Sequence, residues 1–137
     1  MFRTDRIVEV NEMLSLAKLL QLTGLSATAA LILAILIVEG RPLSLKELSE
    51  KTGYAKGHLS SILQFLESRK LVEKVYEKRR KLLVKVKEKA VSNLLREHLS
   101  TLREIIQEII SEMKKDIVVT ELKPFEVELM KMLKVLR

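Results

Sequence analysis

The spacing of apolar residues changes at Leu71, and this change limits the folds open to the chain. Before Leu71, apolar residues recur every three or four positions, as on one face of a helix. After it, residues 72–76 can form a strand, and over 82–86 Leu82, Val84 and Val86 alternate with Leu83, Lys85 and Lys87, as in a strand with one largely basic face. Five consecutive charged residues, 77–81, separate the two stretches and suit the tip of a hairpin. We therefore expect helices followed by a two-stranded hairpin.

Residues 44–69 carry the clearest helix boundaries in the chain. Ser44 and Glu47 have the S-x-x-E spacing of a capping box, which marks the start of a helix. Gly53 is expected to end this short helix, because glycine readily adopts the left-handed conformation that follows a helix. A second helix is expected over residues 55–69. The predicted order is thus short helix, glycine turn, helix and charged hairpin.

The net positive charge of the chain is confined to residues 54–89. This segment holds eleven basic and four acidic residues, and its net charge equals the formal +7 of all 137 residues. A basic segment in an otherwise neutral chain is typical of proteins that bind polyanions such as nucleic acids. A lysine-rich solvated surface would give the same count, so charge alone does not decide between these interpretations.

Taken together, residues 26–86 resemble a winged helix-turn-helix domain, and residues 43–75 carry the resemblance. With helices on both sides, the chain is most similar to the multiple-antibiotic-resistance regulator (MarR) family or to archaeal GbsR-type regulators. The resemblance implies a mainly α fold with a small β-hairpin wing. It assigns residues 1–25 to an N-terminal dimerisation helix, 26–86 to the DNA-binding domain and 87–137 to a C-terminal helical dimerisation region. That family often has glycine where this chain has Lys70.

The resemblance implies a dimeric DNA-binding transcription regulator. Its recognition helix, residues 55–69, would enter the major groove, and its basic wing, residues 74–85, would contact the minor groove and the phosphates. The candidate base-reading residues are Lys56, Gly57, His58, Ser61 and Gln64. The candidate wing residues are Lys74, Lys78, Arg79, Arg80, Lys81 and Lys85. Double-stranded DNA is therefore the expected partner.

Apolar residues elsewhere suggest how two copies would associate. Residues 4–21, 87–115 and 124–136 have helical apolar spacing, and the stripe over 87–115 is too wide to face solvent. DNA sites of such regulators come as two half-sites, so we expect a homodimer. The candidate dimer-interface residues are Ile7, Val10, Leu14, Leu95, Leu99, Leu102, Ile106, Ile109, Met113, Leu129 and Leu133.

Residues 25–38 are uncharged and raise the question of a membrane helix. With the residues from Leu22 onward, the uncharged run reaches 17 residues, the lower limit for spanning a bilayer. Polar residues in its first half argue against a span, so we expect a helix that is apolar all round because it is buried all round. A small monomer offers little room to bury such a helix, and a dimer offers more. We expect no membrane partner.

No residues are arranged for catalysis or for holding a cofactor. His58 and His98 have no cysteine or suitably spaced carboxylate near them, and the four glycines form no phosphate-binding loop. We therefore expect no enzyme activity, no cofactor and no metal. A small-molecule effector stays possible, although no pattern marks a site for one. The absence of cysteine and of a secretory leader points to the cytoplasm, and the high lysine, glutamate, isoleucine and leucine content points weakly to an archaeal or thermophilic source.

Three other functions stay open at this point. A winged helix can serve as a protein-interaction module in a larger transcription or other assembly, because fold alone does not fix function. A nonspecific architectural DNA binder would show steep salt dependence and no preferred site. A membrane protein could be built on residues 25–38. No pattern in the sequence identifies the operator, the regulated genes or the sign of regulation.

Overall fold

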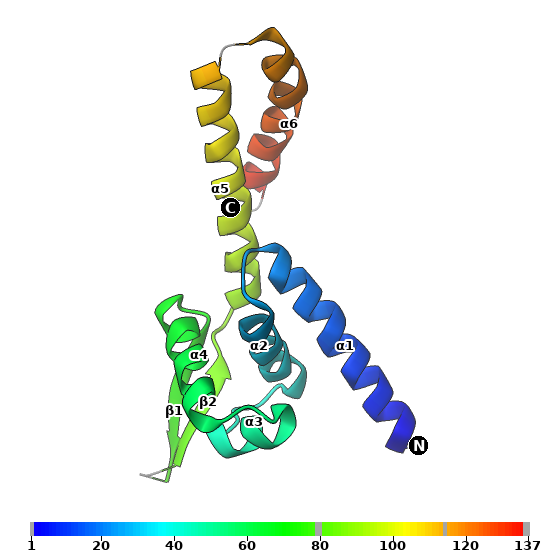
Figure 1. The fold of residues 1–137 in the computed structure, drawn as a ribbon, viewed down its shortest axis with the longest axis vertical. Coiled ribbons are helices and arrows are strands. Elements are labelled where there is room, and N and C mark those ends of the chain that lie inside the picture. Colours follow the sequence, from blue (N-terminus) through cyan, green and yellow to red (C-terminus); the bar gives the residue numbers. More distant parts are fainter. Residues whose placement is uncertain (1, 79–80, 114, 136–137) are drawn as a thin grey trace. The chain divides into compact units, whose positions relative to one another are not determined.

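The computed structural model describes residues 2–78, 81–113 and 115–135, with side chains from residue 10 onward. The fold is mainly helical with one antiparallel hairpin, which confirms the predicted fold class. The chain divides into two compact units, residues 1–91 and 92–137 (Figure 1). The three functional regions drawn from the sequence stay a prediction.

The helices and strands follow one another in the predicted order. The first unit contains α1 (Phe2–Leu22), α2 (Ala27–Glu39), α3 (Leu45–Thr52), α4 (Lys56–Ser68), β1 (Val72–Glu77) and β2 (Lys81–Val86). The second unit contains most of α5 (Ala90–Met113) and all of α6 (Asp116–Val135).

Helix α2 forms the centre of the first unit, packed against α1, α4 and β2. The Ser26 hydroxyl accepts a hydrogen bond from the Ala29 amide at 3.2 Å and caps the start of α2, and Gly40 ends it with φ of 67°. Most of the apolar residues of α2 are buried, so the first unit of a single chain offers enough room to cover this helix. No helix in the described ranges is long and apolar enough to cross a membrane.

The start of α3 confirms the predicted capping box. The Ser44 hydroxyl accepts from the Glu47 amide at 3.1 Å, and the Ser44 amide donates to the Glu47 carboxylate at 3.3 Å. Arg41 donates to the other oxygen of that carboxylate at 2.8 Å, and this hydrogen bond lowers the pKa of Glu47 from its ordinary value. Leu43 and Leu48 are completely buried beside this cap. The turn after α2 and the first turn of α3 are therefore fixed to each other.

The hairpin pairs β1 with β2 in a register that runs from Val72 opposite Val86 to Glu77 opposite Lys81. The strands thus extend one residue further toward the tip than the predicted 72–76 and 82–86. Leu43 adds a backbone bridge to Val84, with hydrogen bonds of 2.9 and 2.8 Å. Val72 and Val84 are buried, so one face of the hairpin belongs to the core of the first unit.

Helix α4 is followed by a left-handed residue that is not glycine. Lys70 has φ of 61°, its amide donates to the Glu67 carbonyl at 2.9 Å, and the Leu71 amide donates to the Leu66 carbonyl at 3.0 Å. These two bonds make a Schellman ending, in which glycine usually holds the left-handed position. Lys70 therefore adopts the left-handed conformation that glycine usually adopts at this position. For a residue with a Cβ this conformation costs about 1 kcal/mol or more.

We expect Lys70→Gly to stabilise the protein. Relief of the left-handed conformation is offset in part by the greater freedom of glycine in the unfolded chain, so the net gain should be about 0.5–1 kcal/mol. Thermal unfolding followed by circular dichroism should show a midpoint raised by a few degrees. Lys70→Ala is the control, because it removes the charged side chain and keeps the Cβ. If Lys70→Ala stabilises the protein as much as Lys70→Gly, the destabilisation comes from the lysine charge and not from the left-handed backbone.

In the second unit, the prediction that a final helix starts at Pro124 was wrong. Helix α6 begins eight residues earlier, at Asp116, and Pro124 lies inside it. Val118 and Val119 disfavour a helix only slightly, and Asp116 stabilises the first turn through the helix dipole. Pro124 removes one backbone hydrogen bond without ending the helix.

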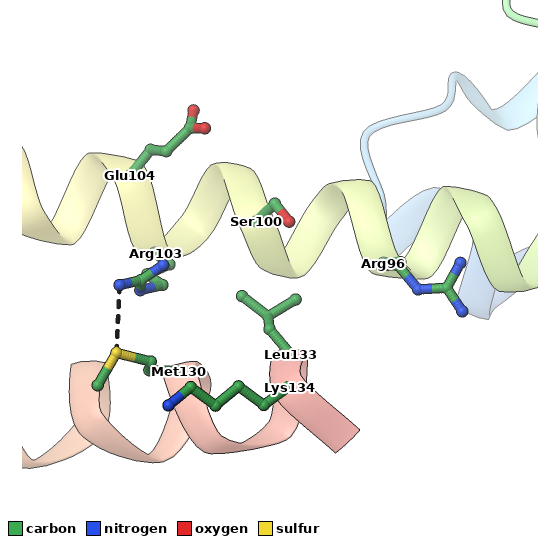
Figure 2. A pocket seen from close by; sticks show the side chains of 7 residues that line it. All are labelled: Arg96, Ser100, Arg103, Glu104, Met130, Leu133 and Lys134. Atoms are coloured by element: carbon green, nitrogen blue, oxygen red, sulfur yellow. Dashed lines mark hydrogen bonds between the residues drawn. The ribbon is translucent and has the colours of Figure 1, made fainter. Parts of the chain in front are cut away.

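Helices α5 and α6 are joined by a buried carboxylate. Glu126 is 3% exposed and accepts a hydrogen bond from Gln107 at 3.0 Å. Arg103 Nε lies 3.5 Å from Glu126 Oε1, and Lys123 Nζ lies 3.5 Å from Glu126 Oε2. Arg103 also lines a cavity of about 370 Å³ between the two helices (Figure 2). The hydrogen bond from Gln107 leads the causes that lower the pKa of Glu126, so this carboxylate is charged at neutral pH and its ionised form holds the two helices together.

Candidate nucleic-acid interface

Helix α4 has one buried face and one open face. The buried residues, which hold it against α2, α3 and β1, are Leu59, Ile62, Leu63 and Leu66. The five predicted base-reading residues, Lys56, Gly57, His58, Ser61 and Gln64, are all exposed. Gly57, Ser61 and Gln64 follow the spacing i, i+4, i+7 and so form one stripe. The structure thus brings the candidate residues together on the solvent side of a single helix.

Local contacts arrange the first turn of α4. The rings of Tyr54 and His58 lie edge to face with centroids 5.3 Å apart, which orients the imidazole at the start of the helix. The Ser61 hydroxyl donates to the Gly57 carbonyl at 3.3 Å. A Cβ added at Gly57 would meet no atom within 4 Å, so nothing inside the described chain requires glycine there. Ala55 supplies no side-chain cap, which leaves the first amides of α4 without a side-chain acceptor.

Phe65 is a candidate site residue that the sequence analysis missed. Its side chain is 45% exposed, and it lies four residues after Ser61 and seven after His58 on the open side of α4. The pattern could have revealed it, because Phe65 lies off the apolar stripe of α4. An exposed ring on such a helix can contact the methyl group of thymine in the major groove.

Two of the predicted wing lysines lie beside carboxylates. Lys85 Nζ is 3.4 Å from Glu73 Oε1, directly across the hairpin, and Lys74 Nζ is 3.7 Å from Glu67 Oε1 on α4. All four side chains are partly exposed, so the pairs are weak and can be broken. The charge of these two lysines is therefore partly balanced before any partner arrives.

The unbalanced charge of the hairpin lies nearer its tip. Lys78 and Lys81 are exposed, and neither makes an ion pair within the part of the chain that the structure describes. Lys78 has φ of 46°, as a residue leaving a strand into a tight turn. Arg79 and Arg80, also predicted to contact DNA, lie outside the described residues.

The predicted dimer-interface residues differ in exposure. In α1, Val10 and Leu14 are 46% and 52% exposed, and the side chain of Ile7 lies outside what the structure describes. In the second unit, Met113 is exposed, Ile106 and Leu129 are buried, and the half-buried residues are Leu95, Leu99, Leu102, Ile109 and Leu133. Further exposed apolar residues there, absent from the prediction, are Ile105, Ile117, Phe125, Met132 and Val135.

Both histidines lie on helices. His58 contacts Tyr54, and His98 is half-buried on α5. Across the described ranges, no group of three or more histidine, cysteine, aspartate or glutamate residues is placed to hold a metal ion.

Sequence comparison gives the same domain. Residues 23–81 match the model of the MarR family. Two proteins of Bacillus subtilis (strain 168), the HTH-type transcriptional repressor OpcR and the putative HTH-type transcriptional regulator YvaV, are each 34% identical over 55 residues. That match covers 40% of this chain and 30% and 31% of the relatives. The chain therefore matches less than a third of the length of either relative.

Structural comparison extends the likeness beyond the matched segment. A crystal structure described as a transcriptional regulator has a TM-score of 0.63 and 16% identity, covering 93% of this chain and 92% of its own. Wild-type apo MarR from E. coli has a TM-score of 0.50 and 18% identity, covering 100% and 96%. At these identities the likeness concerns the fold. The chain therefore has a MarR-like winged helix-turn-helix fold, and residues 23–81, which match the family model, include the residues 43–75 that carried the resemblance.

Proposed function

We propose that this protein is a dimeric DNA-binding transcription regulator that places α4 in the major groove. The observation that carries the proposal is the open face of α4, where exposed polar residues and Phe65 lie on a helix held rigidly by its buried face. Such a helix fits the major groove of B-DNA and can present side chains to base edges. The amides at the start of α4, which lack a side-chain cap, suit a DNA phosphate and would fix the orientation of the helix.

The hairpin would supply contacts that do not read sequence. Lys78 and Lys81, exposed and without ion pairs in the described chain, suit phosphates or an adjacent minor groove, where the potential is strongly negative. Lys74 and Lys85 could join them once their pairs with Glu67 and Glu73 open. We propose these four lysines as the positioning contacts of the complex.

Two chains would be needed to read two half-sites. The exposed apolar residues of α1 and of the second unit would be covered by a second copy, because apolar surface in contact with water favours association. We propose that these surfaces form the dimer body. We also propose a cytoplasmic location. We also expect no enzyme activity.

Enrichment of random duplexes on the purified chain tests the proposal. We expect an inverted repeat whose half-sites lie about one helical turn, roughly 10 base pairs, apart, with binding that weakens as salt rises. Binding without any enriched site would favour a nonspecific architectural DNA binder. Absence of binding at low salt would favour a protein-interaction module, since fold alone permits one.

The same enrichment on Phe65→Ala tests the residue that the sequence analysis missed. We expect the enriched site to lose a thymine preference at one position of each half-site, because the apolar contact with the methyl group is gone. Gln64→Ala is the matched comparison, and we expect it to change a different position. An unchanged site for Phe65→Ala, in a variant with unchanged circular dichroism, would remove Phe65 from base recognition.

A further inference from the structure

The hairpin has a face that is not part of the core of the first unit. Successive residues of a strand point to opposite faces, so the buried Val72 and Val84 mark the face that packs on the core. On the other face, the register of β1 and β2 places three opposite pairs, which are Glu73 with Lys85, Val75 with Leu83, and Glu77 with Lys81. These residues form the outer face of the hairpin.

The outer face is open at its centre. Val75 and Leu83 are half-buried, so the rest of the chain does not cover them completely. They border a hollow of about 450 Å³, which Arg41 and Pro42 of the turn after α2 also line. Apolar side chains beside an open hollow favour a partner that removes them from water.

Each strand contributes charge of one sign to the outer face. Strand β1 has a carboxylate on each side of its apolar residue, and β2 has a lysine on each side of its own. At the end of the hairpin nearer the core, Lys85 Nζ lies 3.4 Å from Glu73 Oε1. Nearer the tip, Glu77 and Lys81 are exposed and make no ion pair within the described residues. Their charges are therefore available to a partner.

This arrangement of charge is complementary to itself. A two-fold axis along the strands would lay β1 of one copy over β2 of a second, with both hairpins pointing the same way. Glutamate would then face lysine at both ends, and Val75 would face Leu83 at the centre. Packed sheets lie about 10 Å apart, a gap that facing glutamate and lysine side chains can span. Turning the second hairpin end for end would instead bring Glu73 opposite Glu77, and like charges in such positions are destabilising.

We propose that the outer face of the hairpin docks on the same face of a second copy of this chain. A second copy is the occupant because the order of charges matches itself under a two-fold rotation, as an isologous interface requires. The face uses no residue of α1 or of the second unit, so it would join one dimer to another.

The contact is expected to be weak and to form in the absence of DNA. Stable interfaces use about 20–30 residues a side, far more than the three pairs of the outer face, so association should appear only toward millimolar concentrations of chain. Lys81 and Lys85 cannot contact phosphates and a second chain at once, so bound DNA would compete with this association.

Sedimentation velocity of the full chain without DNA, from micromolar to millimolar concentration, tests the proposal. We expect the mean mass to double or more over this range. Glu77→Lys and Lys81→Glu should each lower the association constant by about tenfold or more, because each brings like charges together across the interface. An equimolar mixture of the two variants should associate again, since the lysines of one then face the glutamates of the other. Both positions are exposed, so circular dichroism should show unchanged folding.

The matched control is the pair Lys46→Glu and Glu50→Lys. Both residues are exposed on α3, lie four positions apart and do not line the hollow, and the pair makes the same changes in charge. Each control variant alone should associate as the original chain does, and mixing the two should change nothing.

Three results would overturn the proposal. The mass of the original chain could stay constant over the whole range, as it would if the outer face docks a different protein. The association could survive both outer-face reversals, which would place it on α1 or the second unit. The control variants could lose association alone and regain it when mixed, which would attribute the effect to net charge. The test uses no DNA, so a failed search for an operator leaves it intact, and a constant mass leaves the proposed regulator intact.

Discussion

The double variant Glu67→Gln/Glu73→Gln is expected to bind all DNA duplexes more tightly, by roughly tenfold at low salt. Each substitution releases one hairpin lysine, Lys74 or Lys85, from a carboxylate 3.7 or 3.4 Å away. Exposed pairs of this kind are worth about 0.2–1 kcal/mol each, and removing two negative charges also lessens repulsion of the phosphates. Phosphate contacts do not read bases, so operator and random duplexes should gain alike.

Fluorescence anisotropy over a salt titration is the measurement. Each additional lysine–phosphate contact steepens the slope of log affinity against log salt by about 0.9, so the double variant should gain between one and two. Glu121→Gln/Glu128→Gln is the matched control, because it makes the same change in net charge on α6, away from the hairpin lysines in sequence. Equal gains in both variants would attribute the effect to net charge, and no gain in either would mean that Lys74 and Lys85 do not contact DNA.

Features set by neighbouring residues could be predicted from the sequence. The capping box of Ser44 and Glu47 and the end of α3 at Gly53 depend on residues a few positions apart, and both are present as expected. The open face of α4 follows from helical spacing, since the buried stripe determines which residues are left exposed. Position 70 is different, because its residue type did not indicate its conformation. The backbone is left-handed there although the residue is lysine, where the family often has glycine.

Features that depend on how two elements meet could not be predicted. The pairing of Lys85 with Glu73 needs the register of the hairpin, and a shift by one residue would bring different side chains opposite each other. The charged tip offers no glycine or asparagine that would have identified its turn and hence that register. The cavity of the second unit likewise needs α5 and α6 in contact, and the prediction that a helix would begin at Pro124 had already divided α6.

Leu14→Glu is expected to convert the protein from a dimer to a monomer. Leu14 is 52% exposed and lies one turn after Val10, which is 46% exposed, whereas Ala17 and Leu20 of the same helix are buried. A charge at an exposed position should leave the folding of one chain nearly unchanged. In a dimer interface the same carboxylate would be buried without a partner, which is strongly destabilising.

Sedimentation velocity at micromolar concentration should show the mass of two chains for the original protein and of one chain for Leu14→Glu. Loss of the second half-site contact should also lower operator affinity by about a hundredfold or more, because linked binding of two sites is lost. Ser15→Glu adds the same charge at the next position of α1, on a different side of the helix, and should keep both the mass and the affinity. Val10→Glu should repeat the effect of Leu14→Glu. Two-chain masses for both Leu14→Glu and Val10→Glu would exclude this face of α1 from the dimer and leave the second unit to join the chains alone.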